Sequence, residues 1–318
     1  MSRKHTRPDR RCTSGKTVDA KSRLRDRSRA LDCTGTRVAN DFMMKNWLGL
    51  SWSDWVGLNA SPEEFRETIT TDPGLYRVRV KGVGKLAYIG QTGRNLRART
   101  RALGRNTYRS QPPWNDPHTA APGLWAWKME ESFDYELSVV SKIIGTAERQ
   151  CIEDMLLYEY RLEAEESTLC NHGRFHPSWS RPTNKKKARK MKKLVGTTNP
   201  AGEPSLAQAQ FSDKPSAEDW LFLNWSKKLP LSTKARAPNA AGVYKLMRRD
   251  EVVYVGESSD LHDRMRSHSR RFRKENLEAS WVEMPHALSH HLKERETDLI
   301  GGFYKALLRP PLFQYKPL

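Results

Sequence analysis

The sequence predicts an α+β protein made of two similar bodies, and three observations carry this prediction. One motif occurs twice: Gly74-Leu75-Tyr76 followed by Tyr88-Ile89-Gly90, and Gly242-Val243-Tyr244 followed by Tyr254-Val255-Gly256. The length of 318 residues suits about two domains. Each copy also combines strand-like alternation with later helix-like segments. An internal repeat of this kind indicates that the chain contains two copies of one structural unit.

The repeat and the local composition divide the chain into four parts. Residues 1–40 are rich in charged and small polar residues, so we expect a disordered basic tail. Residues 41–177 and 217–318 hold the two motif copies, the first with an insertion. Residues 178–216 contain a basic run from Lys185 onward and are expected to form a flexible linker. The basic run suits either a nuclear import signal or a phosphate-contacting strap.

Each copy is expected to form a β-hairpin. In the first, Tyr76, Val78 and Val80 alternate with arginines, as in a half-buried strand. The runs 86–89 and 252–255 follow after short turns, so they should pair with the preceding runs in antiparallel fashion. We interpret the glycine that closes each motif as a sharp corner leading into a helix.

Two helices are expected in each copy. The basic ones cover about 94–104 and 259–270, and the later ones about 147–165 and 287–308. The last helix should pack on a sheet through one apolar face: Leu292, Leu299, Ile300, Phe303 and Leu307.

Tryptophans five residues apart open each body: Trp47 and Trp52, then Trp220 and Trp225. This spacing favours a shared packing element over a base-stacking platform. The first body also has about 22 extra residues between the basic helix and the later one. This insertion carries candidates for DNA contact or for ordinary packing: Trp114, Asp116, His118, Trp125 and Trp127.

The charge of the chain points to a polyanionic partner. Lys and Arg number 56 against 37 acidic residues, a net charge of +19, and nucleic acid is the commonest polyanion. Charge used only for solubility is the alternative. No window approaches the roughly 18 apolar residues of a membrane span, and no secretory signal opens the sequence. We therefore expect no membrane partner and a cytoplasmic location. Association with a bacterial nucleoid is compatible with this location.

The four cysteines do not predict a disulfide framework or a four-cysteine zinc site, because they are widely spaced. Cys170, His172 and His176 lie close together in the sequence. A structural zinc usually has four ligands, and no fourth one is evident nearby.

With the paired motifs in view, both bodies resemble GIY-YIG nuclease domains, a family named after such Gly-Ile-Tyr and Tyr-Ile-Gly segments. The resemblance covers most of both bodies but not the tail or the linker. It implies a small three-stranded antiparallel sheet flanked by helices in each body. It also implies metal-dependent cleavage of DNA, with Mg²⁺ or Mn²⁺ as the cofactor.

The resemblance also implies the site residues. The two tyrosines of each motif, Tyr76 with Tyr88 and Tyr244 with Tyr254, would orient or deprotonate water. The family's arginine corresponds to Arg99 and Arg264, which would grip phosphate oxygens in a fork. Its metal-binding glutamate corresponds to Glu153 and Glu296, and its asparagine to Asn171. Gln314 takes the place of that asparagine in the second body, since Asn171 and Gln314 both follow their glutamate by eighteen residues.

The two copies are not equally equipped for cleavage. Many relatives have a histidine or tyrosine one helical turn after the arginine, where His268 stands in the second copy. Leu103 stands there in the first, so a proton-handling group is missing unless Tyr108 or His118 supplies it. The second body is therefore predicted to be the better candidate for cleavage.

The predicted function is a divalent-metal-dependent DNA endonuclease, related to restriction, defence or repair. The alternative is a nucleic-acid-binding protein in which one or both nuclease domains are inactive. An enzyme with one cutting and one docking domain is a third reading. The sequence leaves open whether DNA or RNA is bound, because phosphate contacts fix position without reading bases.

Overall fold

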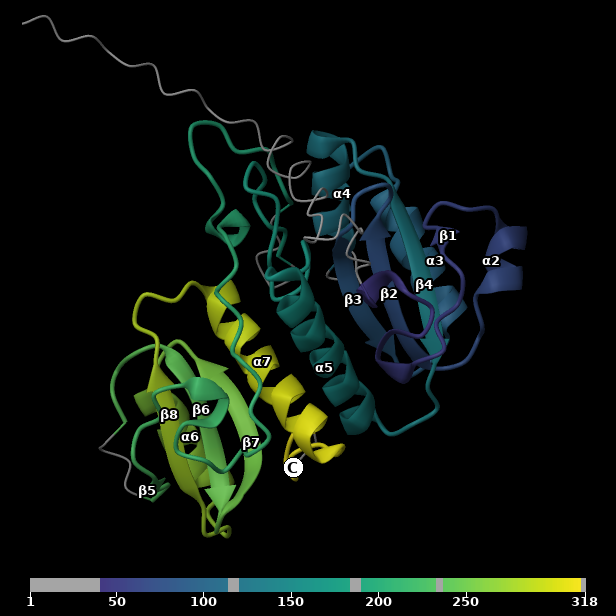
Figure 1. Cartoon of the computed structure of the whole chain (residues 1–318). Helices are drawn as coiled ribbons and strands as arrows, with labels where there is room; N and C mark the ends of the chain where they lie inside the picture. Colours follow the sequence, from purple (N-terminus) through teal and green to yellow (C-terminus); the bar gives the residue numbers. More distant parts are fainter. Residues whose placement is uncertain (1–40, 114–119, 184–189, 233–236, 316–318) are drawn as a thin grey trace, which may run out of the picture. The chain divides into compact units, whose positions relative to one another are not determined.

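The computed structural model describes residues 41–113, 120–183, 190–232 and 237–315, which form an α+β structure (Figure 1). The tail expected to be disordered, residues 1–40, lies outside them. The α-helices are α2 (Pro62–Thr68), α3 (Leu96–Thr107), α4 (Ala121–Glu131), α5 (Thr146–Ala164), α6 (Leu261–Arg271) and α7 (Ser289–Leu307). Short 3-10 turns cover Asp41–Met43, Trp47–Gly49, Pro200–Gly202 and Trp220–Phe222.

Two antiparallel sheets have the same strand order, β1-β4-β2-β3 and β5-β8-β6-β7. The strands of the first half of the chain (41–177) are β1 (Val56–Gly57), β2 (Gly74–Val80), β3 (Leu86–Thr92) and β4 (Tyr135–Ser141). Those of the second half (217–318) are β5 (Leu229–Pro230), β6 (Gly242–Arg248), β7 (Glu251–Ser258) and β8 (Glu278–Glu283). Each sheet thus has four strands, and the expectation of three was wrong by one. The extra strand is two residues long, too short to show the alternation that predicts a strand.

The predicted hairpins are confirmed, and they explain the glycine of the motif. Tyr76 on β2 pairs with Gly90 on β3, and Tyr244 on β6 pairs with Gly256 on β7. A Cβ atom at Gly90 would lie 2.6 Å from the Tyr76 ring, and one at Gly256 would lie 2.3 Å from the Tyr244 hydroxyl. Both strands continue for two residues beyond the glycine. Interpreting these glycines as corners was therefore wrong: they leave room for the tyrosine of the neighbouring strand.

The paired tryptophans pack on a buried cation in each half, which confirms the packing interpretation. Arg77 lies under Trp47 and Trp52, and Lys245 lies under Trp220 and Trp225. The nearest ring centroids are 4.3 Å from the Arg77 guanidinium carbon and 4.5 Å from Lys245 Nζ, within cation–π range. Burial lowers the pKa of Arg77 to about 9 and that of Lys245 to about 8. Arg77 is thus buried rather than on a solvated strand face.

The last helix, α7, packs largely as predicted. Leu292, Leu299, Ile300 and Phe303 are buried, whereas Leu307 at the end of the helix is exposed. This apolar face meets the other half of the chain as well as its own sheet. Leu156 of α5 and Leu299 of α7 belong to one hydrophobic cluster that draws on both halves. Residues 39–318 accordingly form a single unit.

Helices α5 and α7 pack against each other through matched positions of the repeat (Figure 1). The spacing that matches Glu153 with Glu296 also matches Asp154 with Thr297 and Tyr158 with Gly301. The Thr297 hydroxyl bonds to the Asp154 carboxyl, and a Cβ atom at Gly301 would lie 2.7 Å from Tyr158 Cβ. Equivalent residues that contact each other are the mark of a two-fold arrangement. The two halves therefore pack like the subunits of a symmetric dimer.

Gly301 is expected to tolerate no side chain at this crossing. A Cβ atom there would also lie 2.7 Å from the Asp154 carbonyl oxygen, whereas one at neighbouring Gly302 would meet Leu221 methyl groups at 3.3 Å and the Tyr158 ring at 3.6 Å. Gly301→Ala should lower the free energy of unfolding by about 2 kcal/mol relative to Gly302→Ala, since overpacking costs about 1–3 kcal/mol. The gain in helix propensity, about 1 kcal/mol, is common to both variants. Urea unfolding of the two proteins measures the difference, and equal stabilities would contradict the close crossing.

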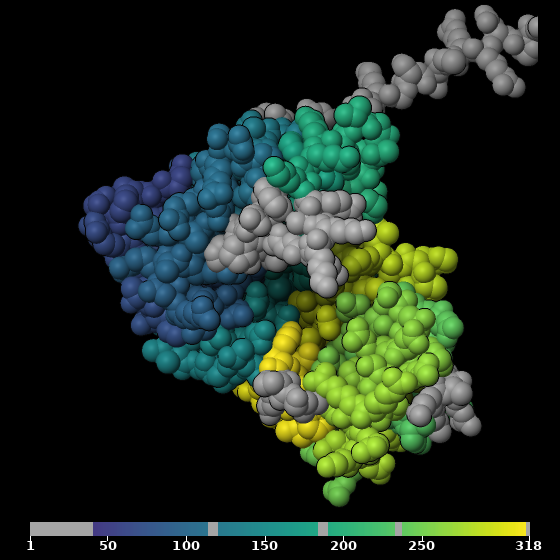
Figure 2. Space-filling model, turned by 180° about the vertical axis from the view of Figure 1, so that it is seen from behind, coloured from purple at the N-terminus to yellow at the C-terminus, as the bar shows by residue number. Residues whose placement is uncertain are grey.

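The described part of the 178–216 segment is bound to this helix pair. The peptide N–H of Leu206 donates to Glu294 and that of Ala209 donates to Asp298, at 2.8 and 3.1 Å. The Tyr158 hydroxyl donates to the Ala209 carbonyl at 2.8 Å. Figure 2 shows the segment, in teal-green, against the blue surface of the first half. Composition alone predicts that this segment is a flexible linker. In the structure, its peptide N–H groups donate hydrogen bonds to the buried carboxylates of Glu294 and Asp298.

Candidate active sites

The first half brings four predicted residues together from four elements. Tyr76 of β2 and Tyr88 of β3 have ring centroids 6.0 Å apart. Arg99 of α3 donates from Nε to the Tyr76 hydroxyl at 3.4 Å. Glu153 of α5 lies close enough to Tyr76 and Arg99 to interact electrostatically with both side chains. Burial raises the pKa of Glu153 to about 7, although Arg99 and Arg149 act in the opposite direction.

The second half repeats this arrangement and adds a histidine. The Tyr244 and Tyr254 rings stack with centroids 6.2 Å apart, and Arg264 interacts with both. Burial raises the pKa of Glu296 to about 8, reinforced by the nearby Glu257 carboxyl. The Glu296 carboxylate also accepts a hydrogen bond from the Glu257 backbone N–H.

His268 lies against the first tyrosine of the second motif. Its Nε2 is 2.7 Å from the Tyr244 hydroxyl, and the side chain is buried. Burial lowers the pKa of His268 to about 4, helped by Arg264 and Arg271, so the ring is neutral near pH 7. With the ring proton on Nδ1, Nε2 accepts the Tyr244 O–H. Among the described residues, Nδ1 has no hydrogen-bond partner.

The first tyrosine of each motif stays protonated near neutral pH. Burial raises the pKa of Tyr76 and Tyr244 above the usual value of about 10. Arg99 and Arg264 lower these pKa values, but by less than burial raises them. The phenols are therefore hydrogen-bond donors, and the Tyr244 hydroxyl has His268 Nε2 as its acceptor.

Asn171 and Gln314 bind the backbone of the strands that carry the second tyrosine of each motif. Asn171 Oδ1 accepts from the Ile89 N–H at 2.9 Å, and its Nδ2 donates to the Ile89 carbonyl at 2.8 Å. Gln314 Oε1 accepts from the Val255 N–H at 3.1 Å. Ile89 and Val255 are the middle residues of the two Tyr-x-Gly motifs, so Asn171 and Gln314 make corresponding backbone contacts in the two halves. Their geometry is that of residues that position the second tyrosine.

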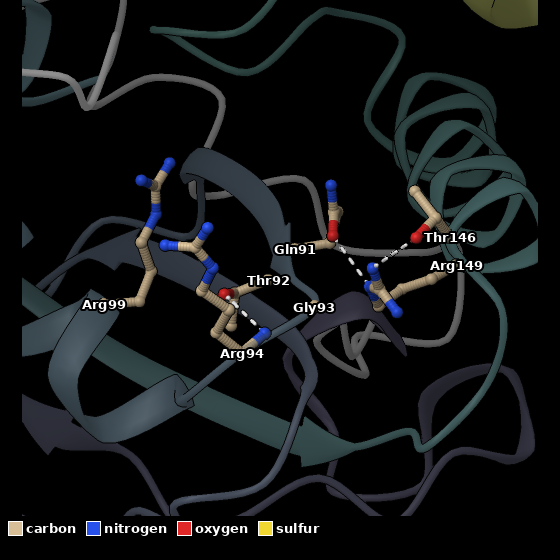
Figure 3. Close-up of a pocket in the computed structure, with 7 residues that line it drawn as sticks. All are labelled: Gln91, Thr92, Gly93, Arg94, Arg99, Thr146 and Arg149. Atoms are coloured by element: carbon tan, nitrogen blue, oxygen red, sulfur yellow. Dashed lines mark hydrogen bonds between the residues drawn. The ribbon is translucent and has the colours of Figure 1, made fainter. Parts of the chain in front are cut away.

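A polar pocket of about 480 Å³ opens beside Arg99 in the first half, lined by Gln91, Thr92, Gly93, Arg94, Arg99, Thr146 and Arg149 (Figure 3). Arg94 and Arg99 lie on one side of it and Arg149 on the other. Arg94 and Arg149 were not among the predicted site residues. Arg149 precedes Glu153 by four residues on one helix face, and this spacing was the available signal.

The proton-handling group missing from the first half is not supplied by Tyr108. Leu103, at the place of His268, is buried in the core. Tyr108 is bonded through its hydroxyl to Asp134 and to the Tyr135 N–H. His118, Trp114 and Asp116 of the insertion lie outside the described residues. Trp125 and Trp127 of α4 pack against other aromatic rings, which favours the packing alternative for those two.

The cysteine and histidine cluster has other roles in the structure. Cys170 is buried in a hydrophobic cluster, and His176 lies 3.6 Å from Glu131 and against the Trp127 ring. Nowhere in the described ranges do three or more His, Cys, Asp or Glu side chains gather as for a metal ion.

Comparisons with known proteins gave no match: neither protein-family models, nor curated proteins, nor solved structures resemble the chain closely enough to be recognised. Among the described helices, none is long and apolar enough to cross a membrane. The two sites themselves therefore carry the functional argument.

Proposed function

We propose that the protein is a divalent-metal-dependent endonuclease acting on DNA, with its main cleavage site in the second half. One observation carries the proposal: two tyrosines, an arginine and a glutamate from four separate elements meet in both halves. This constellation is the one that the resemblance to GIY-YIG nucleases implies. Chance convergence of the same four residue types twice is a poor explanation for it.

The donor set suits magnesium or manganese. Glu296 is half-buried, and burial together with the Glu257 charge raises its pKa, so a proton or a cation would stabilise it. The Glu257 carboxyl, which interacts electrostatically with Glu296, is an oxygen donor of the type that Mg²⁺ prefers. In the first half, Glu153 is the corresponding ligand. A bound divalent ion would stabilise negative charge on the phosphoryl group and the leaving oxygen.

The remaining residues of the second site have roles that follow from their contacts. Arg264 can grip non-bridging phosphate oxygens through its forked guanidinium. The Tyr244 O–H donates to His268 Nε2, 2.7 Å away, so the Tyr244 oxygen can accept a hydrogen bond from a water molecule and hold it for attack on phosphorus. Tyr254, which is partly exposed, can orient that water. Leu103 leaves Tyr76 without such an acceptor, so the first site lacks this means of orienting its phenol.

DNA is the proposed substrate because of the charge of the chain, +19 overall. Incubation of the full chain with supercoiled plasmid tests the proposal, with Mg²⁺, with Mn²⁺ and with EDTA. We expect nicked and then linear DNA with either metal and intact plasmid in EDTA. Binding without nicking under every metal condition would instead support the alternative, an inactive nucleic-acid-binding protein. A structured RNA of similar length, run in parallel, establishes which nucleic acid is cut.

A further inference from the structure

We infer that the arginine-lined pocket of the first half, which we call the arginine pocket, is a phosphate-binding subsite that docks nucleic acid while the second half cuts it. The arginine pocket consists of Gln91, Thr92, Gly93, Arg94, Arg99, Thr146 and Arg149. The inference rests on the proposed function for the identity of the ligand. It assigns a separate task to Arg94 and Arg149, which the proposed cleavage chemistry does not use.

Arg149 is fixed in place by the protein, as a binding group should be. The side chain is 4% exposed; Nε donates to Gln91 Oε1 at 2.8 Å and one terminal nitrogen donates to the Ile144 carbonyl at 2.9 Å. A Cβ atom at Gly93 would lie 2.5 Å from the other terminal nitrogen, so glycine leaves room for the guanidinium. Among the described residues, the hydrogen-bond acceptor nearest to that nitrogen is Thr146 Oγ1, at 3.5 Å. It therefore keeps hydrogen-bonding capacity for a ligand.

The start of helix α5 adds further donors to the arginine pocket. Its N-cap is Gly145, and no side chain caps the first turn. The first backbone N–H groups of a helix have no acceptor within the helix and favour anions. Glu148 in that turn is engaged by the Tyr304 hydroxyl of α7 at 3.3 Å. Three arginines and an uncapped helix start thus surround one polar cavity, which suits a phosphate group.

The second half lacks two of the pocket's polar residues, Gln91 and Arg149, and carries a negative charge in the place of one of them. By the spacing of the repeat, Leu292 stands at the place of Arg149, and Glu257 at the place of Gln91. Asp260 caps helix α6 where Asn95 caps α3. The positive charge of Arg149 disfavours a cation at Glu153, whereas the negative charge of Glu257 favours a cation at Glu296. The charges therefore direct an anion to the first half and a metal ion to the second.

Binding of a fluorescent DNA duplex in EDTA tests this inference without any cleavage. Two variants probe the arginine pocket: Arg149→Leu, which copies the second half, and Arg94→Ala, which removes an exposed side chain. Arg105→Ala is the matched control, because Arg105 is an exposed arginine of α3 that does not line the pocket. We expect about tenfold weaker binding for each pocket variant and a salt dependence reduced by about one phosphate contact.

The outcomes separate this inference from the proposed function. If both pocket variants bind DNA like Arg105→Ala, the subsite is wrong, whether or not the protein cuts. If the wild type binds in EDTA through these arginines but never nicks plasmid, the subsite stands and the cleavage proposal fails. Should Arg149→Leu melt at a lower temperature, Arg94→Ala alone decides. A duplex with and without a 5′-phosphate shows whether the bound group is terminal or internal.

Kinetics give a second readout. A docking role predicts that Arg94→Ala raises KM for plasmid several-fold and leaves kcat close to that of wild type. A drop in kcat with unchanged KM would place Arg94 in cleavage itself and overturn the docking role.

Discussion

Replacing Glu296 with glutamine is expected to slow magnesium-dependent nicking by about 10³-fold. Glutamine keeps the shape of the side chain but has no negative charge to hold a divalent ion. Losing the charge stabilisation that such an ion supplies, about 4 kcal/mol, corresponds to this factor, because each 1.4 kcal/mol or so is tenfold in rate. Quantified plasmid nicking under single-turnover conditions measures the effect.

Glu153→Gln is the matched control, because Glu153 is the equivalent residue of the other half. We expect it to slow nicking by less than about tenfold, since Arg149 lies beside Glu153 and Leu103 replaces the histidine. Equal, near-complete losses in both variants would contradict the division of labour and indicate two cooperating sites. Activity retained by Glu296→Gln would contradict the proposed role of Glu296 as metal ligand. Unchanged melting temperatures would show that both proteins are folded.

The hairpins and the long helices were predictable because their signals are periodic and occur twice. Alternation predicted β2, and the repeat placed β6 at the matching position. The predicted late helices, 147–165 and 287–308, agree with α5 and α7 to within about two residues. Repetition helps because two independent sequences must agree on one structure.

What escaped prediction depends on contacts between segments that are distant in sequence. Arg77 follows Tyr76 on a strand and suggests a solvated face, yet it is buried under tryptophans from another segment. The shared core of α5 and α7 was missed for the same reason. A charged residue such as Asp298 suggests a solvated helix flank when only the local sequence is considered. Its partner, Arg161, lies on another helix, and no local pattern reveals that contact. Helix α4 lies in an insertion that the repeat cannot cross-check.

The sequence predicted which residues make up the candidate sites, but not their burial, their pKa shifts or their hydrogen bonds. The motif supplied the tyrosines, arginines and glutamates, and the structure places them together. The raised pKa of the tyrosines depends on burial, which the motif does not reveal. Asn171 was predicted at the site, but its bonds to Ile89 became visible only in three dimensions.

Removing the carboxylate of Asp298 is expected to lower the free energy of unfolding by about 3–5 kcal/mol. Asp298 is fully buried, and its two oxygens bind Arg161 Nε at 2.8 Å and an Arg295 terminal nitrogen at 3.3 Å. One of them also accepts the Ala209 N–H at 3.1 Å. Breaking a buried ion pair on one side leaves an uncompensated charge, which costs about this much. Urea unfolding of Asp298→Ala, followed by circular dichroism, measures the loss.

The control is Asp54→Ala, which removes an exposed ion pair with Lys45, where the Asp54 side chain is 73% exposed. Solvent screens that pair, so we expect a change of less than about 1 kcal/mol. Asp298→Ala should also unfold both halves together, because Asp298 joins α7 to Arg161 of α5 and to the Ala209 segment. Two separate unfolding transitions, or a loss no larger than that of Asp54→Ala, would contradict a shared core. A single cooperative transition at lower urea would show that the two sites are built on one folding unit.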